Sequence, residues 1–207
     1  MIRGLICFGD SILAGTGASS REKACSKLLK SWLKVPVLLK GINRQTSEDG
    51  LVRLSQDVLE QKECSHVVIL FGNNDCRLVS LDQSAVPQGR FMENLKNMAL
   101  QIKGSGKVPL FCNLQPIDAV KLFRAVPDFR KFQVPGAPDP EKLQEIYSDL
   151  VETFSHDHGE CLVDIRTSLK LKKNEILAED GLHPNDSGHE MIARKILEEL
   201  KKLDASL

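Results

Sequence analysis

The sequence is poor in aromatic residues, carries no excess charge of either sign and contains no long apolar run. Only 5% of its 207 residues are aromatic, with one Trp and one Tyr, which leaves few platforms for stacking on sugars. Lys and Arg together number 28, and so do Asp and Glu. The formal charges therefore cancel, and no net positive charge attracts nucleic acid or an anionic membrane. No apolar stretch reaches the roughly 18 residues of a membrane span. We therefore expect no nucleic-acid partner and no stable membrane insertion.

Paired cysteines and a leader segment are also missing. None of the six cysteines has the C-x-x-C spacing of a zinc or redox site: Cys7, Cys25, Cys64, Cys76, Cys112 and Cys161. We interpret them as small apolar residues in a reducing compartment. The first residues include one basic side chain and an apolar stretch that Asp10 interrupts, too short for a signal-peptide core. These features predict a cytoplasmic location, no metal and no cofactor.

Length and composition are those of a globular protein. A chain of 207 residues is about one and a half times a typical domain, and 42% of its residues are hydrophobic and 27% charged. The chain is therefore long enough to bury a sizeable hydrophobic core, and we predict a single domain over residues 1–207. The sequence indicates no oligomeric state.

Short apolar runs alternate with segments of helical periodicity. Parallel strands that are buried on both faces read as continuous apolar runs, and five such runs occur, at residues 5–8, 35–39, 67–71, 108–112 and 161–165. Between them, apolar residues recur three or four positions apart, as in Leu143, Ile146, Leu150 and Phe154. The alternation predicts a three-layer α/β/α sandwich around a five-stranded parallel sheet, with ligand sites beyond the carboxyl ends of the strands.

One long stretch, from about 118 to 140, shows no regular pattern. It carries Pro127, Pro135, Gly136, Pro138 and Pro140, with three phenylalanines among them. A loop of that length in a compact domain is usually functional or mobile. We predict a lid or insertion that covers an acyl chain, with packing against the body of the domain as the alternative.

A serine follows the first predicted strand, in Gly9-Asp10-Ser11-Ile12. At a strand-to-helix turn its hydroxyl is exposed at the sheet edge, where helix N–H groups stabilise negative charge, so Ser11 is a candidate nucleophile. Serine is also a preferred helix cap, and the segment alone does not separate the two roles. A phosphate loop is the other candidate, but no Lys-Ser/Thr pair follows Gly15.

Two further polar segments follow later strands. The first is Gly72-Asn73-Asn74-Asp75, where glycine allows close approach of the backbone and an Asn amide can donate to an oxygen that becomes negative. The second is Asp180-Gly181-Leu182-His183-Pro184, where a carboxylate three residues before an imidazole can hold Nδ1–H and turn Nε2 outward as a base. Taken singly, each is also an ordinary turn or surface pair.

The three segments together resemble the SGNH (GDSL-type) hydrolase family. Phe8-Gly9-Asp10-Ser11, Gly72-Asn73-Asn74-Asp75 and Asp180-Gly181-Leu182-His183-Pro184 are similar to its first, third and fifth sequence blocks, in the same order. Weaker similarity around Val86-Pro87 and over residues 143–165 extends the resemblance to nearly the whole chain except about 118–140. Any one of these blocks often occurs by chance, whereas three of them in the family's order are highly specific for the family.

The resemblance implies a flavodoxin-like fold and an enzyme that hydrolyses esters. It places Ser11 as nucleophile, His183 as base, Asp180 as acid of the triad and Asn74 as an oxyanion donor, with the backbone N–H of Ser11 as another. The second block departs from the family, because Arg44 falls where a glycine is usual and Gly41 lies three residues too early. The backbone N–H of Arg44 can still donate to an oxyanion. We expect Gly9, Asp10, Gly72 and Asp75 to support the site, the two carboxylates as cap or loop braces.

The resemblance also sets the range of functions. We expect hydrolysis of a small or medium acyl ester, a small-molecule substrate, through an acyl-serine intermediate. Thioester or lysophospholipid hydrolysis, carbohydrate O-deacetylation and acyl transfer to an alcohol use the same residues. A non-catalytic binding module of this fold is the alternative from another class, and only Arg44 favours it.

Overall fold

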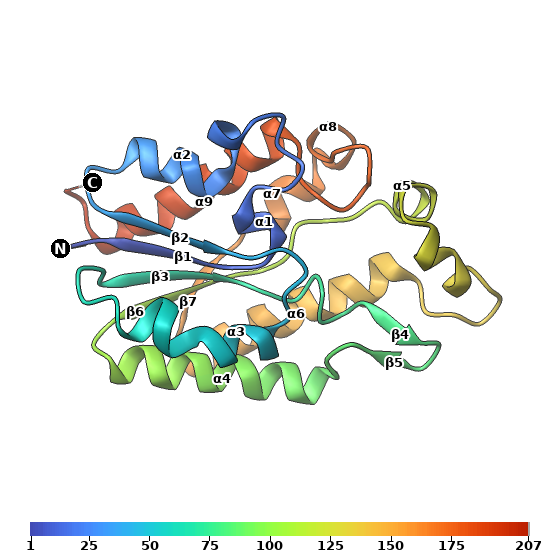
Figure 1. Ribbon diagram of the computed structural model, residues 1–207, viewed down its shortest axis with the longest axis horizontal. Helices are drawn as coiled ribbons and strands as arrows, with labels where there is room; N and C mark the ends of the chain where they lie inside the picture. Colours follow the sequence, from blue (N-terminus) through green and yellow to red (C-terminus); the bar gives the residue numbers. More distant parts are fainter. Residues whose placement is uncertain (207) are drawn as a thin grey trace.

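The computed structural model describes residues 1–206, without the side chains of Asp128 and Arg130. Its centre is a five-stranded sheet in the order β2-β1-β3-β6-β7, and every neighbouring pair is parallel (Figure 1). The strands are β1 (Leu5–Gly9), β2 (Val37–Gly41), β3 (His66–Leu70), β6 (Val108–Cys112) and β7 (Cys161–Val163). The predicted sheet is confirmed, and each strand overlaps one of the five apolar runs.

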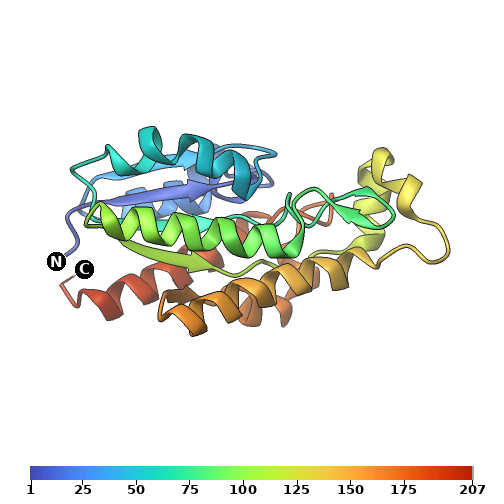
Figure 2. The ribbon, with the colours of Figure 1, turned by 90° about the horizontal axis from the view of Figure 1, so that it is seen from below.

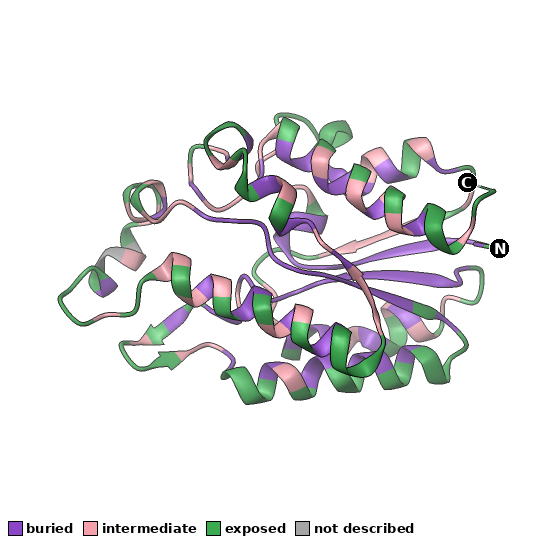
Figure 3. Cartoon of the chain, turned by 180° about the vertical axis from the view of Figure 1, so that it is seen from behind, coloured by how far each residue is buried: buried purple, intermediate pink, exposed green. Residues whose placement is uncertain are grey.

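The strand interiors explain why these runs are continuously apolar. Every residue of β1 and β3 is buried, since both strands lie inside the sheet and helices cover both faces (Figure 3). Gly9 pairs with Gly41 of β2 on one side and with Leu70 of β3 on the other. The carboxyl ends of these three strands therefore finish level, at one edge of the sheet.

Helices form the two outer layers. On one face α2 (Cys25–Trp32) packs against α9 (Asp186–Leu203), and on the other α3 (Ser47–Leu54), α4 (Gln88–Gly104) and α6 (Pro140–His158) lie side by side (Figures 1 and 2). Caps mark their starts: Asn185 accepts from Gly188 N–H before α9, and Asp139 accepts from Glu141 N–H before α6. The fold is thus the expected three-layer α/β/α sandwich.

Short elements complete the chain. These are α1 (Ser11–Ala14), η1 (Arg21–Lys23), η2 (Ser55–Leu59), α7 (Arg166–Lys170) and α8 (Lys173–Ile176). The two termini lie together at the end opposite the carboxyl ends of the strands (Figure 1), where Ile2 N–H donates to Asp204 Oδ2 over 2.6 Å. Over residues 1–206 no helix combines the length and apolarity needed to cross a membrane.

Additional elements extend the carboxyl edge of the sheet. A hairpin of β4 (Leu78–Ser80) and β5 (Gln83–Ser84) lies there beside α5 (Ala119–Ala125) and η3 (Pro127–Phe132), as Figure 2 shows. The prediction of an irregular stretch over 118–140 was wrong for residues 119–125 and 127–132, which form these two short helices. Asp118 caps α5 by accepting from Lys121 N–H, and the prolines that suggested irregularity fall at the start of η3 and beyond it.

Candidate active site

Ser11 is the first residue of α1, and only Asp10 separates it from the end of β1. Asp10 caps this short helix, with Oδ1 accepting from Ile12 N–H over 2.9 Å, and Gly15 ends it in the left-handed conformation at a φ of 95°. The cap holds the Ser11 side chain at the carboxyl edge of the sheet, where it is 7% exposed.

Asp180 and His183 lie on a tight turn that a bridge between Leu177 and Pro184 closes. Asp180 Oδ1 accepts from the backbone N–H groups of Leu182 and His183, each over 2.9 Å, which folds the turn around the carboxylate. Asp180 Oδ2 is thereby left for the imidazole, 2.5 Å from His183 Nδ1. The Asp-x-x-His spacing thus brings the two side chains into contact.

The His183 ring also reaches the serine, 172 residues away in the chain. Its Nε2 lies 2.9 Å from Ser11 Oγ. Burial would raise the pKa of Asp180, but hydrogen bonds from the His183 ring and from two backbone N–H groups lower it to about 2. Because an ionised carboxylate can only accept, Nδ1 carries the ring proton and Nε2 of the neutral ring is free to accept from Ser11.

Asp10 belongs to a buried polar network that ties the three segments together. Its Oδ2 accepts from Asn73 Nδ2 over 3.2 Å, and Asn73 Oδ1 accepts from Gln115 Nε2 over 3.0 Å. Gln115 Nε2 also donates to the carbonyl of Leu182, next to His183, over 3.2 Å. One fully buried glutamine beyond β6 therefore links the serine segment, the Asn73 segment and the histidine turn.

Sequence reasoning missed this network. Gln144 of α6 donates to Asn73 Oδ1, and Arg166 donates to Gln144 Oε1 over 2.7 Å, so the network continues into the helical layer. The available signal was the position of Gln115, a polar residue three positions beyond an apolar strand, at the same edge as the other motifs. Gln144 and Arg166 lie within helices and give no comparable signal.

Asp10 should make the stability of the protein depend on pH. Burial raises its pKa to about 7, even though hydrogen bonds from Ile12 and Asn73 oppose the shift. Between about pH 4 and 7 the unfolded chain has lost this proton and the folded chain keeps it, so the free energy of unfolding falls as pH rises, by at most about 1.4 kcal/mol per pH unit. Asp10→Asn removes the titration, and we expect its unfolding free energy to fall less over this range.

Urea denaturation at pH 5, 6 and 7 measures this slope. Asp157→Asn, a change at an exposed position of α6, is the matched control and should keep the slope of the unmodified protein. Identical slopes for Asp10→Asn and the unmodified protein would show that Asp10 does not titrate in this window.

The end of β2 and the loop after it place unusual demands on the backbone at Gly41 and Arg44. A Cβ on Gly41 would lie 2.2 Å from the backbone nitrogen of Ala14, so only glycine lets β2 pass this close to α1. Arg44 has a φ of 67° and is the sole non-glycine residue with positive φ among the described residues. The left-handed turn is thus present at the position that the resemblance assigned to glycine, and an exposed arginine occupies it.

Arg44→Gly should stabilise the protein. A residue with a Cβ pays a cost in the left-handed region that glycine avoids, and we expect a gain of up to about 1 kcal/mol in unfolding free energy, or about 2–4 °C in Tm. Thermal denaturation measures the change, and a lower Tm would show that the guanidinium makes a compensating contact.

Asn74 and Asp75 connect the segment after β3 to the same loop. Asn74 Nδ2 donates to the carbonyl of Gln45, beside Arg44, over 3.0 Å, which leaves its second hydrogen for another acceptor. Asp75 accepts from Ser47 N–H over 2.9 Å and from Ser47 Oγ over 2.5 Å, so it stabilises the start of α3. Its hydrogen bonds therefore reach beyond the turn in which Asp75 itself lies. Burial raises the pKa of Asp75 to about 6.

The two glycines of the supporting set have separate steric roles. Gly9 ends β1, and a Cβ there would lie 2.4 Å from the Leu70 carbonyl oxygen. Gly72 has a φ of 134°, where side chains are rarely tolerated. Gly9 thus allows the close approach of β1 to β3, and Gly72 allows the backbone conformation that precedes Asn73.

His189 and the Cys25 thiol occupy buried positions. His189 is buried under the loop after α1, where its Nε2 lies 3.0 Å from the Thr16 carbonyl, and burial lowers its pKa. Burial raises the pKa of the Cys25 thiol to about 12, which keeps it protonated. No group of three or more His, Cys, Asp or Glu side chains among the described residues is placed to hold a metal ion.

Comparison with known proteins identifies the family and the fold. A model of the GDSL-like lipase/acylhydrolase family matches residues 7–191. A lipase/acylhydrolase from Enterococcus faecalis is 28% identical, with a TM-score of 0.75 over 97% of this chain and 96% of that one. Axe2, an acetylxylan esterase from Geobacillus stearothermophilus, is 21% identical with a TM-score of 0.72 over 96% and 94% of the two chains, a likeness of fold.

One further relative matches over a shorter part of the chain. YqeF, a lipoprotein of Bacillus subtilis (strain 168), is 30% identical over 119 residues, which make up 55% of this chain and 49% of that protein. The match therefore spans about half the length of this relative.

The fold and the segments at its carboxyl edge define a hydrolase of the SGNH class. The chain belongs to the GDSL-like lipase/acylhydrolase family, and by family it is a carboxylic ester hydrolase.

Proposed function

We propose that the protein hydrolyses a carboxylic ester of a small or medium acyl group in two steps, through an acyl-serine. The observation that carries the proposal is the continuous contact from Ser11 Oγ to His183 Nε2, over 2.9 Å, and from His183 Nδ1 to Asp180 Oδ2, over 2.5 Å. A hydroxyl hydrogen-bonded to a neutral imidazole, which a carboxylate in turn orients, is the arrangement that nucleophilic acyl transfer requires.

In the first step Ser11 Oγ attacks the carbonyl carbon of the ester while His183 Nε2 takes the hydroxyl proton. The imidazolium that forms is stabilised by the ionised Asp180 and returns the proton to the leaving alcohol as the C–O bond breaks. In the second step water attacks the acyl-serine, and His183 again accepts and returns the proton. The products are the carboxylic acid and the alcohol, and Ser11 is regenerated.

The oxyanion of each tetrahedral intermediate would be held by three donors. These are the backbone N–H groups of Ser11 and Arg44 and the remaining amide hydrogen of Asn74. The contact of Asn74 with the Gln45 carbonyl places its amide beside the Arg44 loop, which supports a shared role for the two. Each such donor typically lowers the barrier by about 3–4 kcal/mol.

Deacetylation of xylan, the activity for which Axe2 is named, has less support in this chain. The single Trp, Trp32, lies on α2 with Arg194 over its ring at 5.5 Å. The single Tyr, Tyr147, is fully buried and donates to the Val86 carbonyl. Neither ring is available at the carboxyl edge as a platform for a sugar, so we favour esters of simple alcohols.

Labelling with an alkyl fluorophosphonate tests the proposal. The reagent phosphonylates a serine that a neighbouring base activates, so we expect one adduct, located at Ser11 by peptide mass spectrometry, and loss of p-nitrophenyl ester hydrolysis in step with labelling. No adduct under conditions that label a control esterase would favour a non-catalytic module. If a competing alcohol is added and a new ester of the acyl group with that alcohol forms, the protein is instead an acyltransferase.

We also propose that residues 1–207 form one domain and that the protein is cytoplasmic. All six cysteines are free, and five of them are buried, which suits a reducing compartment. Cell fractionation tests the location, and a membrane-bound or exported form would overturn it.

A further inference from the structure

The turn that carries His183 lies outside the sheet, so strand pairing does not set its position relative to Ser11. Its internal hydrogen bonds fix its shape, since Asp180 accepts from the N–H groups of the turn and Ala178 N–H donates to the His183 carbonyl over 2.8 Å. All of these partners lie within residues 178–183. They would be kept if the whole turn moved away from Ser11, so contacts with other segments must hold it in place.

A glutamine side chain from beyond β6 holds the turn next to the base. Gln115 Nε2 donates to the Leu182 carbonyl over 3.2 Å. This carbonyl and the N–H of His183 belong to one planar peptide group. Gln115 holds the carbonyl side of that group and Asp180 Oδ1 holds the N–H side, so the backbone that leads into His183 is fixed from both sides.

Two backbone segments also touch the turn. Asp118 N–H donates to the Gly181 carbonyl over 2.7 Å. On the other side lies the loop after α1, where a Cβ on Gly17 would be 2.7 Å from the His183 Cβ. These are main-chain and steric contacts, whereas Gln115 acts through its side chain. A substitution at Gln115 can therefore remove its contact and leave the other two.

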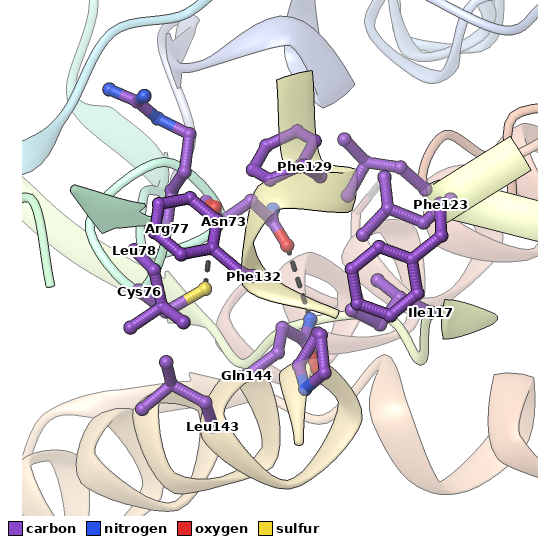
Figure 4. Close-up of a pocket in the computed structure, with 13 residues that line it drawn as sticks. Asn73, Cys76, Arg77, Leu78, Ile117, Phe123, Phe129, Phe132, Leu143 and Gln144 are labelled. Atoms are coloured by element: carbon purple, nitrogen blue, oxygen red, sulfur yellow. Dashed lines mark hydrogen bonds between the residues drawn. The ribbon is translucent and has the colours of Figure 1, made fainter. Parts of the chain in front are cut away.

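The Gln115 amide is held in one orientation. It is fully buried, and both hydrogens of Nε2 are used, one for Asn73 Oδ1 over 3.0 Å and one for the Leu182 carbonyl. Its Oε1 accepts from Asn73 Nδ2 over 3.4 Å. Asn73 Oδ1 also accepts from Gln144 Nε2 over 3.1 Å, a contact that Figure 4 marks. A flipped Gln115 amide would turn its oxygen toward two acceptors, which burial makes costly.

The same network reaches the nucleophile. Asn73 Nδ2 donates to Asp10 Oδ2 over 3.2 Å, and Asp10 Oδ1 accepts from Ile12 N–H in the helix that begins at Ser11. Ser11 and His183 are therefore joined twice. One connection is the direct contact over 2.9 Å, and the other runs through buried side chains.

The buried connection matters most in the acyl-serine. While Ser11 is free, its hydroxyl donates to His183 Nε2 and helps to hold the ring. Once Ser11 Oγ carries the acyl group, it has no proton to donate, yet His183 must stay in place to accept the proton of the attacking water. Contacts elsewhere in the protein must then hold the base.

We propose that Gln115 is a positioning residue, which keeps His183 opposite Ser11 and has its largest effect on the hydrolysis of the acyl-serine. The inference rests on the proposed ester hydrolysis and adds a residue that acts through the base. A side chain that only stabilised the fold would change neither chemical step in the folded protein, whereas loss of a positioning side chain slows the second step more than the first.

Gln115→Met tests the assignment, because methionine has a similar length and no hydrogen to donate. Stopped-flow measurements with p-nitrophenyl butyrate give the acylation rate from the first release of p-nitrophenol and the deacylation rate from the steady state. We expect deacylation to become about 10–100-fold slower and acylation less than about fivefold slower, because a misplaced base transfers protons poorly. The acyl-serine should accumulate, as measured by mass spectrometry of the intact protein.

Ser148→Ala is the matched control. Leu114 N–H donates to the buried Ser148 Oγ over 3.1 Å, so this change removes a buried hydrogen bond at the residue before Gln115. It should lower Tm and leave both rates unchanged. If Gln115→Met does not fold, Gln115→Glu keeps the shape of the side chain and leaves at most one hydrogen for the two acceptors, and it should show the same kinetic pattern.

A readout without turnover separates this inference from the proposed function. In Ser11→Ala the introduced methyl group should show a nuclear Overhauser effect to the His183 ring, and adding Gln115→Met should remove it. This result without hydrolysis of any ester by the unmodified protein would sink the proposed function and leave the positioning role standing. Unchanged deacylation in folded Gln115→Met, equal slowing of both steps, equal loss in Ser148→Ala, or a persistent Overhauser effect in the double variant would each overturn the inference.

Discussion

Replacing Ser11 by alanine should lower kcat for p-nitrophenyl ester hydrolysis by at least about 10⁴-fold. The change removes the only oxygen within hydrogen-bond distance of His183 Nε2 among the described side chains, so no acyl-serine can form and water must attack the ester directly. The fold should survive, because the Asp10 cap of α1 and the backbone contacts of the turn do not involve the hydroxyl. KM should change little, since the substrate contacts are retained.

Initial rates at saturating substrate measure the effect, with Tm and circular dichroism as checks of folding. Ser20→Ala, at an exposed position just before η1, is the matched control and should keep full activity. A Ser11→Ala rate within tenfold of the unmodified protein would remove Ser11 as the nucleophile, and the two-step mechanism with it.

Asp180→Asn should lower kcat by about 10⁴-fold through the tautomer of His183. In the present geometry one Asp180 oxygen accepts from two backbone N–H groups and the other accepts from the ring. An asparagine that keeps its oxygen on the backbone turns its NH₂ toward His183 Nδ1, so the ring must accept there and carry its proton on Nε2. An Nε2–H cannot accept the proton of Ser11.

Nitrogen NMR of the imidazole reports the tautomer directly, and steady-state kinetics report its effect. We expect the ring proton to move from Nδ1 to Nε2 in the variant, together with the loss of kcat. Asp157→Asn changes an exposed carboxylate of α6 and should alter neither. Full activity in Asp180→Asn would mean that the carboxylate does not set the ring's protonation, whereas lost activity with an unchanged tautomer would assign it a purely electrostatic role.

The fold could be predicted because its main signals are local. Strands β1 and β3 are buried throughout and the other three are apolar over most of their length, so each appears as an apolar run of about the right length. The hairpin β4–β5 was missed, since its two strands are short and partly exposed and carry no such run. The helices within 118–140 were missed because Pro127 and its neighbours suggested an irregular chain.

The candidate site could be predicted as three segments and not as a whole. Ser11, Asn74, Asp180 and His183 lie in recognisable motifs, and the structure brings Ser11, Asp180 and His183 into contact; their catalytic roles stay predictions. Gln115, which donates to both Asn73 and Leu182, could not be identified as their link. Its partners are 42 and 67 residues away, and nothing local marks the pairing.

The sequence by itself determined the α/β alternation, the chemistry available at the end of each strand and the family, because periodicity and short motifs are properties of neighbouring residues. Only the tertiary structure decided the left-handed turn at Arg44 and the buried link through Gln115. Each of these depends on which surfaces of distant segments meet. That meeting is set by the packing of two helical layers on one sheet and not by any single stretch of chain.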